Sequence, residues 1–280
     1  ALVEVVKVPS EMMSASNKDN AIGQALYNTF LTLGEKTKDH KTGATLVASA
    51  VYDNKIYTAN TGDSRSMIVR RNAQGVFECQ RLTALHSPQQ TDERERILKV
   101  GGRLSGGSRI SHYTGEFSVA TSRAFGDNGF TGVTYEPELS SYQFSPNEEV
   151  YLIQCCDGVT DAMNEQDIAA LFNAAPPQID LDHMANGIRK EAFARGSTDN
   201  ITVAITPLGK GAKKTKPNEM ILSMVSDGHG GDATSDFISK NIVSDFKKQM
   251  SSLETEIRFQ YQNQVKGGND ALLFKQVLNL

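Results

Sequence analysis

The spacing of apolar residues along the chain switches repeatedly between the period of a helix and that of a strand. Residues 18–33 place Ile22, Ala25, Leu26 and Phe30 at helical spacing, which predicts a helix with one buried face. The stretch that follows, GATLVASAVYDNKIYTANTGDSRSMIVRR, is rich in β-branched and small residues, and its Asp-Asn pair is a turn signal. We therefore expect a helix followed by a series of short strands.

Later segments continue this alternation of strands and helices. SPQQTDERERILKVGG predicts a short helix that begins after its proline and ends at the Gly-Gly pair. EEVYLIQCC and NITVAITPL are predicted strands, whereas NEQDIAALFNAA and residues 180–195 are predicted helices. Residues 220–226 form a predicted strand that leads into a helix of about 18 residues from Asp232, and residues 269–280 also have a helical pattern. Residues 103–135 are rich in Gly and Ser, which indicates loops and short strands.

Several predicted strands follow one another as hairpins, which favours antiparallel sheets over a doubly wound parallel sheet. We therefore predict an α+β fold, a β-sandwich of two antiparallel sheets flanked by α-helices in four α-β-β-α layers. The length of 280 residues suits a single domain over residues 1–280 with a sizeable core. The basic, polar stretch GKGAKKTKPNE at residues 209–219 is the best candidate for a linker or for displaced chain ends.

Composition narrows the class of protein. With 39% hydrophobic and 22% charged residues, the chain has ordinary values for a soluble globular protein. It shows neither a signal peptide nor an apolar run of the roughly 18 residues that span a bilayer. The net charge of −4 argues against nucleic-acid or membrane partners. The three cysteines argue against a disulfide framework, so we expect an intracellular protein, cytoplasmic or nuclear. We also expect a monomer.

Acidic residues recur where predicted strands begin or end. They lie in four segments, at Asp63, at Asp157 and Asp161, at Asp199, and at Asp227. Carboxylates that cluster without Lys or Arg partners repel one another, and a divalent cation removes this repulsion. Oxygen ligands in this number suit Mg²⁺ or Mn²⁺ rather than zinc, and two such ions activate a bridging water and clamp a phosphoryl group. The glycine after Asp227 lets the backbone approach closely, which makes the Gly228 carbonyl a further candidate ligand.

Each of these features also has a simpler structural explanation. An Asp-Gly pair after a strand is usually only a turn, and an isolated histidine such as His229 is more often structural than catalytic. Cys155 and Cys156 are not expected to be nucleophiles, because their neighbours form a buried strand in which thiols are inert. Only the whole set of acids, glycines and histidine in one chain indicates catalytic chemistry.

These segments together resemble the metal-dependent serine/threonine protein phosphatases of the type two-C family. GATLVASAVYDNKIYTANTGDSR is similar to that family's Gly-Ser-Thr-Ala strand and Gly-Asp-Ser-Arg turn, and VATSRAFGD is similar to its Ser-Arg-Ala-x-Gly-Asp segment. LTALHSPQQTDERERILKVGGRL resembles its Leu-Thr-x-Asp-His-Lys-Pro segment and Glu-x-x-Arg-Ile helix. CCDGVTD, GSTDNITVAIT and VSDGHGG resemble its Asp-Gly-x-x-Asp, Asp-Asn and Asp-Gly-His-Gly-Gly motifs. The resemblance covers most of the chain.

The resemblance implies hydrolysis of phosphoserine and phosphothreonine in protein substrates by a water that bridges two Mg²⁺ or Mn²⁺ ions. Some family members bind a third metal ion more weakly. Matched motif by motif, the implied ligands are Asp227, Gly228 through its carbonyl, Asp157, Asp199 and, for the third ion, Asp63 and Asp161. Asp227 would bridge the first two ions. His229 would be the general acid that protonates the departing serine or threonine oxygen, a contribution of roughly 10²–10⁴-fold.

The order of the motifs departs from that of the family. The Asp-Gly-His-Gly-Gly signature usually stands near the start, whereas VSDGHGG here follows the Asp-Asn strand. Joining residue 280 to residue 1 continues an apolar helical pattern, through Leu273, Val277, Leu280, Val3 and Val6. We therefore hypothesise a circularly rotated order, whether natural, engineered or a matter of numbering. The usual chain ends would then lie within residues 209–219.

Part of the family's pattern is missing before Asp227. The usual Arg and Glu-Asp pair are not found there, and Glu219 in KKTKPNEM is the only candidate for the family's metal-binding Glu. Lys213 and Lys216 are candidate substitutes for the phosphate-binding Arg, although charged residues in such a stretch are usually only solvated. Leu85 also stands where an Asp normally precedes the family's histidine.

Two other functions fit parts of this pattern. A catalytically weak or inactive phosphatase fold, serving as a binding or regulatory module, would keep the strands and lack the Arg. A different two-metal hydrolase such as a nuclease would share the acids, but the acidic net charge argues against a basic nucleic-acid groove. The phosphatase interpretation accounts for the cluster of acids and for His229 together. It also predicts that residues 103–135 form a flap beside the site and influence the choice of substrate.

Overall fold

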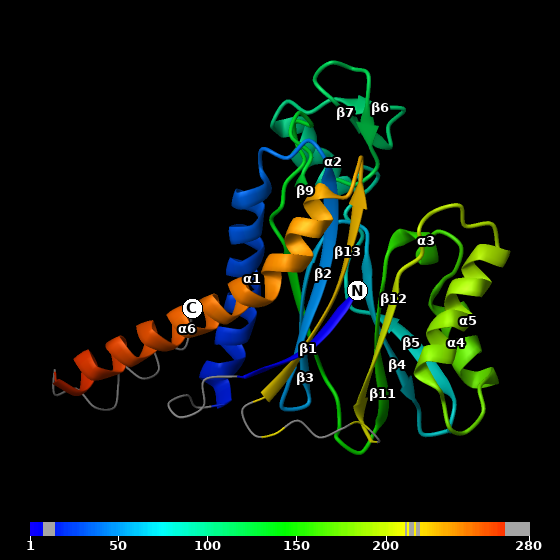
Figure 1. Ribbon diagram of the computed structural model, residues 1–280, viewed down its shortest axis with the longest axis vertical. Coiled ribbons are helices and arrows are strands. Elements are labelled where there is room, and N and C mark those ends of the chain that lie inside the picture. Colours follow the sequence, from blue (N-terminus) through cyan, green and yellow to red (C-terminus); the bar gives the residue numbers. More distant parts are fainter. Residues whose placement is uncertain (8–14, 211, 213–215, 217–218, 267–280) are drawn as a thin grey trace.

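Two antiparallel β-sheets that pack face to face form the centre of the molecule. The computed structural model describes residues 1–7, 15–210, 212, 216 and 219–266. Figure 1 shows two long helices outside one sheet, α1 (Ala15–Thr37) and α6 (Ala233–Lys266). Two shorter helices lie outside the other sheet, α4 (Glu165–Ala174) and α5 (Leu181–Ala194). The four layers confirm the predicted α-β-β-α sandwich of the α+β class.

The first sheet holds the strand that carries Asp227 and His229. Its strands, in spatial order, are β1 (Leu2–Lys7), β13 (Glu219–His229), β2 (Gly43–Tyr52), β3 (Lys55–Thr61) and β10 (Glu138–Gln143). The short strand β9 (Phe125–Gly126) also pairs with β2. The register places Asp227 opposite Thr45 and His229 opposite Gly43. Residues 221–224 of β13 pair on both sides, with β1 and with β2, whereas Asp227 and His229 pair with β2 and their position is fixed by that ladder.

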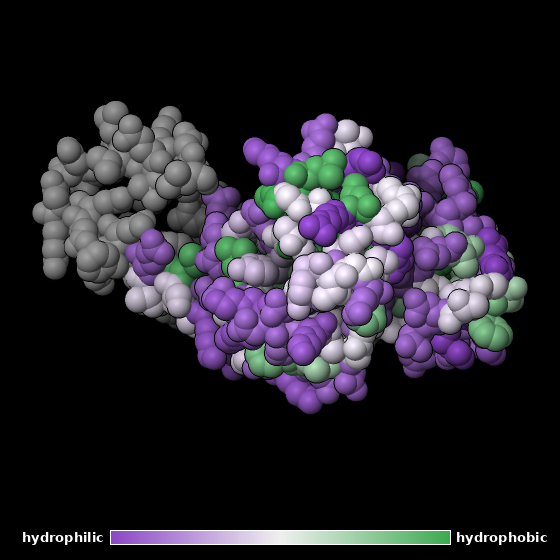
Figure 2. Space-filling model, turned by 90° about the horizontal axis from the view of Figure 1, so that it is seen from above, coloured by the Kyte–Doolittle hydropathy of each residue, from purple (hydrophilic) through white to green (hydrophobic). Residues whose placement is uncertain are grey.

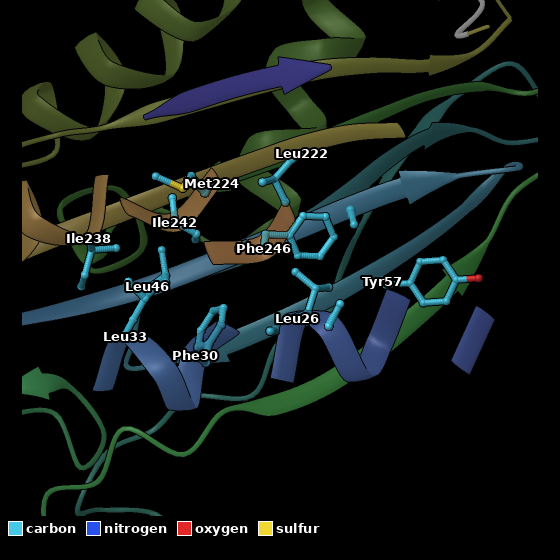
Figure 3. Close-up of a cluster of buried hydrophobic side chains, with 14 of the residues drawn as sticks. Leu26, Phe30, Leu33, Leu46, Tyr57, Leu222, Met224, Ile238, Ile242 and Phe246 are labelled. Atoms are coloured by element: carbon cyan, nitrogen blue, oxygen red, sulfur yellow. The ribbon is translucent and has the colours of Figure 1, made fainter. Parts of the chain in front are cut away.

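Helices α1 and α6 cover the outer face of this sheet, and Figure 3 shows their side chains meeting those of the strands. Phe30 from α1 and Phe246 from α6 are fully buried, and the rings of Phe30 and Phe125 lie 5.6 Å apart. Helix α6 is longer than the predicted 18 or so residues, because neither Gly nor Pro interrupts the chain between Ala233 and Lys266. Among the described residues, no helix combines the length and the hydropathy needed to cross a membrane.

The second sheet brings Asp157 and Asp63 to the same end of the molecule. Its strands, in spatial order, are β12 (Val203–Gly209), β11 (Glu149–Cys155), β4 (Arg65–Arg71) and β5 (Phe77–Arg81). The short helix α3 (Asp157–Thr160) follows β11 directly. Helix α4 begins with a capping box, in which Asn164 and Asp167 bond to each other's backbone. The apolar faces of α4 and α5 bury Phe172 and Ile188 against this sheet.

The space between the two sheets holds polar as well as apolar side chains. Gln154 is fully buried, and its amide nitrogen donates to Ser49 Oγ at 3.1 Å. Ser223 Oγ donates to Gln154 Oε1 at 2.6 Å, and Ser49 Oγ lies 2.8 Å from Thr58 Oγ1. These bonds connect β11 of one sheet to β2 and β13 of the other. They therefore fix how the two sheets are aligned.

A smaller subdomain, which we call the flap, covers the end of the sandwich at the top of Figure 1. It consists of α2 (Thr91–Lys99) and a small sheet of β6 (Leu104–Ser105), β7 (Arg109–Ser111) and β8 (Ser118–Val119). Ile97, Ile110 and Val119 form its own buried core. The predicted loops and short strands of residues 103–135 are confirmed, except that β9 joins the first sheet of the sandwich.

The start of the chain differs from the prediction. Val3 and Val6 were expected to continue a helix across residues 280 and 1, whereas Leu2–Lys7 forms β1 and pairs with β13. A short segment rich in valine suits an edge strand, in which its backbone groups gain partners from β13. The predicted helix at residues 269–280 lies outside the described residues, as do six positions of the 209–219 stretch. The rotated order and the single domain stay predictions.

Candidate metal centre

Four of the predicted carboxylates gather at the end of the sandwich that the flap covers. Asp227 lies near the end of β13, Asp157 begins α3 after β11, and Asp63 lies in the turn between β3 and β4. Asp199 lies four positions before β12 begins at Val203. All four line one pocket of about 920 Å³, together with Gly228 and His229. The strand ends of the two sheets thus place acids from distant parts of the chain in one cavity.

Asp157 and Asp227 form the tightest pair in this cavity. Ligand atoms of the two carboxylates and of Cys156 all lie within 4.8 Å of one another. Burial, followed by the charge of Asp157, raises the pKa of Asp227 to about 7. Asp157 Oδ1 is buried and has no hydrogen-bond partner among the described residues. A buried oxygen without a partner is unfavourable, and a divalent cation bound between the carboxylates would satisfy it.

Asp63 is held in a tight turn that faces this pair. The backbone N–H of Gly62 donates to His86 Nδ1 at 3.1 Å, and Asn60 Nδ2 donates to the Gly62 carbonyl at 3.1 Å. Burial and the charge of Asp157 raise the pKa of Asp63 to about 6. Burial also lowers the pKa of His86 to about 4, so this ring stays neutral and accepts the Gly62 N–H. His86 therefore supports the turn despite Leu85 at the preceding position.

Asp161 and Asp199 lie at the solvent side of the cluster, and both are exposed. Burial and the charge of Asp157 raise the pKa of Asp161. Asp199 Oδ1 accepts the N–H of Asn200 at 2.7 Å. Burial raises the pKa of the Cys156 thiol to about 11, so it stays protonated and is a poor ligand and nucleophile. The donors that remain are oxygens, which fit a hard cation such as Mg²⁺ or Mn²⁺.

His229 forms a hydrogen bond that the sequence did not predict. Its Nε2 lies 2.8 Å from Oδ2 of Asp127, a side chain that is only 2% exposed. Burial lowers the pKa of His229, but the bond to Asp127 and the charges of nearby carboxylates outweigh burial and raise it above its ordinary value. Asp127 belongs to the VATSRAFGD segment, and that motif was the signal that could have identified it.

Two glycines make room for this pair. A side chain at Gly43 would collide with both His229 Nε2 and Asp127 Oδ1. Gly126 has a φ of 73°, and a side chain there would collide with the Thr42 carbonyl. Gly43 and Gly126 are paired across β2 and β9, so the backbone of three strands converges on the pair. The local structure therefore sets the His229–Asp127 distance closely.

Glu93 of the flap ties α2 to the segment that carries Asp127. Its Oε1 accepts from Arg123 Nη2 at 2.6 Å, and its Oε2 accepts from Arg96 Nη2 at 2.8 Å and from Ser122 Oγ at 2.6 Å. Burial alone would raise the pKa of Glu93, but these hydrogen bonds lower it to about 2. The Glu-x-x-Arg-Ile pattern noted in the sequence thus builds an ion-pair network beside the site.

The structure does not bring Glu219 to the other acids. Glu219 begins β13 and Asp227 lies near its end, which separates them by roughly 26 Å at about 3.3 Å per residue. Glu219 instead accepts the backbone N–H of Lys216 at 3.0 Å. This separation removes Glu219 from the ligand set and Lys216 from the phosphate site, while Lys213 lies outside the described residues. Among the described residues, the lysine and arginine side chains that line the pocket are Lys41 and Arg109.

Comparison with known proteins identifies relatives of most of this chain. A family model described as "Protein phosphatase 2C" matches residues 7–201, so Asp227 and His229 on β13 lie beyond the match. A protein kinase and PP2C-like domain-containing protein of Arabidopsis thaliana is 29% identical over 212 residues, 70% of this chain and 30% of that protein. The integrin-linked kinase-associated serine/threonine phosphatase 2C of Bos taurus is 30% identical over 189 residues, 60% of this chain and 48% of that protein. The chain thus spans less than half the length of these relatives.

Solved structures show the same fold. A serine-threonine phosphatase 2C from Toxoplasma gondii has a TM-score of 0.54 at 17% identity, over 77% of this chain and 72% of that one. A sex determining protein of C. elegans has a TM-score of 0.51 at 25% identity, over 64% of this chain and 50% of that one. The family model covers well over half of the residues. This chain therefore belongs to the protein phosphatase 2C family.

Proposed function

We propose that this chain is a protein serine/threonine phosphatase that requires Mg²⁺ or Mn²⁺, with its catalytic machinery in a single domain over residues 1–280. The observation that carries the proposal is the Asp157–Asp227 pair, whose buried Asp157 Oδ1 lacks a partner among the described residues. Membership of a protein phosphatase family supports phosphoproteins as the substrates. The pocket volume of about 920 Å³ supports a substrate larger than a phosphate ion.

The proposed ligands come from both sheets. They are Asp227, Gly228 through its carbonyl, Asp157 and Asp199 for two cations, with Asp63 and Asp161 at a third position. The raised pKa values of Asp63, Asp161 and Asp227 support this set, because each carboxyl is destabilised as an anion by burial and by Asp157. When bound, divalent cations offset this repulsion, lower the pKa of a water and draw charge from the phosphoryl oxygens.

We assign His229 as the general acid. When the phosphorus–oxygen bond breaks, its electron pair goes to the serine or threonine oxygen, and that alkoxide is a poor leaving group. An imidazolium at His229 gives this oxygen a proton, and the water that adds to phosphorus loses one to the solvent. Asp127 accepts from Nε2, which leaves Nδ1 as the nitrogen available to the leaving group. The His229–Asp127 bond of 2.8 Å therefore supports this role.

The proposal is tested by hydrolysis of p-nitrophenyl phosphate and a phosphothreonine peptide, with and without Mn²⁺. We expect activity that depends on Mn²⁺ and that falls at least about 100-fold in Asp157→Asn, since that variant weakens the metal site. Asp236→Asn is the matched control, because Asp236 pairs with Lys240 on the exposed face of α6. Equal activity of wild type and Asp157→Asn would refute the proposal.

The same assay separates the alternative functions. A protein that binds Mn²⁺ but hydrolyses neither phosphate ester would be a binding or regulatory module. Cleavage of single-stranded DNA in preference to the phosphopeptide would identify a nuclease. The rotated order is tested separately by N-terminal sequencing of the isolated protein. A start at Ala1 shows a covalent rotation, and a start near residue 210 shows that only the numbering is rotated.

A further inference from the structure

The flap exposes two large aromatic side chains beside the candidate metal centre. Tyr113 is 70% exposed and Phe117 is 65% exposed, and both line the pocket that contains Asp157 and Asp227. Figure 2 looks down on this end of the molecule and shows green hydrophobic surface directly beside purple hydrophilic surface. Large apolar groups gathered next to a polar cavity are a common mark of a binding surface.

These aromatic side chains are held by contacts within the flap. The ring of His112 lies 4.2 Å from that of Tyr113, 5.0 Å from that of Phe130 and 6.2 Å from that of Phe117. The backbone N–H of His112 donates to the Phe117 carbonyl at 2.9 Å, and that of Tyr113 donates to the Gly129 carbonyl at 3.0 Å. The surface formed by His112, Tyr113 and Phe117, here called the aromatic rim, is therefore formed before any ligand binds.

Gly129 is needed for this arrangement, because a side chain there would collide with the ring of His112. Gly129 lies two positions after Asp127, so the turn that positions His229 also supports the aromatic rim. Cationic groups line the same pocket. Lys41 is exposed, and Arg109 donates from Nη2 to the Ser118 carbonyl at 2.7 Å. One continuous cavity therefore offers acids for cations, positive charge for a phosphoryl group, and an apolar surface.

We infer that the aromatic rim binds an aromatic or large aliphatic side chain of the substrate protein, close in sequence to its phosphorylated residue. This inference rests on the proposed phosphatase function. The occupant is a substrate segment because the rim and the acids share one pocket, so a chain that presents a phosphate to Asp227 also crosses Tyr113 and Phe117. Burial of one such side chain against the rim raises kcat/KM roughly tenfold.

The test uses phosphothreonine peptides that differ in a single neighbour of the phosphothreonine. Phe is placed at each of three positions on either side, and each peptide is compared with its Ser counterpart. We expect at least one position to raise kcat/KM roughly tenfold with wild-type protein. The double variant Tyr113→Ala, Phe117→Ala should lose this preference, so that it hydrolyses each Phe peptide no faster than the Ser counterpart.

Phe193→Ala is the matched control, because Phe193 is 72% exposed on α5, outside the residues that line the pocket. It should keep the full peptide preference. A flat response of wild type to the position of Phe, or a preference that survives in the double variant, overturns the inference. Either result is distinct from failure of the proposed function. In that case wild type hydrolyses neither p-nitrophenyl phosphate nor any phosphothreonine peptide, and the inference fails as well.

Discussion

Asp127→Asn is expected to slow hydrolysis of phosphothreonine peptides while leaving hydrolysis of p-nitrophenyl phosphate nearly unchanged. Asp127 has a φ of 53°, a backbone conformation that Asn tolerates, so the substitution removes the charge and keeps the shape. The 2.8 Å bond to His229 then changes from charge-assisted to neutral. The peptide requires a proton on its leaving oxygen, whereas p-nitrophenolate leaves without one. The two substrates therefore separate an effect on His229 from a general loss of structure.

The size of the effect follows from the bond that is weakened. Hydrogen bonds to charged groups contribute roughly 1.5–3 kcal/mol and neutral ones roughly 0.5–1.5 kcal/mol, so the midpoints of the two ranges differ by about 1.2 kcal/mol. That difference lowers kcat on the peptide about tenfold. Because the bond to Asp127 raises the pKa of His229, the alkaline limb of the kcat profile should also move to lower pH in Asp127→Asn.

The assay measures kcat for both substrates in wild type, Asp127→Asn, His229→Ala and the double variant. Asp53→Asn is the control, because Asp53 has a φ of 47° in the turn between β2 and β3 and is not among the residues that line the pocket. If Asp127 acts through His229, the double variant is no slower than His229→Ala alone. Equal losses on both substrates, or losses that add in the double variant, refute the reasoning.

Three further predictions concern stability and the ligand set. The pKa of Glu93 lies near 2 against an ordinary 4.5, so its network contributes about 3 kcal/mol above pH 4.5 and loses this as the pH falls towards 2. Urea unfolding measured at pH 6 and pH 3 should therefore show that the free energy of unfolding of wild type exceeds that of Glu93→Gln by less at pH 3 than at pH 6. Gln154→Ala should lower the free energy of unfolding by roughly 3 kcal/mol in the same assay, because it removes one hydrogen-bond partner each from buried Ser49 and Ser223; a loss below about 1 kcal/mol contradicts this account. Glu219→Gln should leave the Mn²⁺ dependence of hydrolysis unchanged, and a weaker response to Mn²⁺ would return Glu219 to the ligand set.

Most elements of the fold could be predicted from local pattern. The helical spacing of residues 18–33 corresponds to α1, and the Asp-Asn turn lies between β2 and β3 as expected. The prediction was wrong at residues 1–7, where a few apolar residues fit a helix or a strand equally well and pairing with β13 decides the outcome. Helix α6 is longer than predicted because neither Gly nor Pro interrupts the chain after its apolar face, so the helix continues to Lys266.

The sequence by itself determined which chemical groups stand at the ends of the strands. Motifs such as VSDGHGG and CCDGVTD place carboxylates at strand ends, and that placement depends on a few adjacent residues, so it is visible without a structure. Their residue types indicate oxygen ligands for a divalent cation, and the resemblance to the phosphatase family implies the acid role of His229.

Only the tertiary structure decided which of these groups meet. Asp127 and His229 are 102 positions apart, and they come within 2.8 Å because β9 and β13 both pair with β2 at Gly43. Glu219 shares a strand with Asp227 yet lies at its far end, where the extended backbone carries it away from the site. Distance along a chain and distance in space are related only through sheet pairing, and pairing is set by long-range packing that short motifs do not encode.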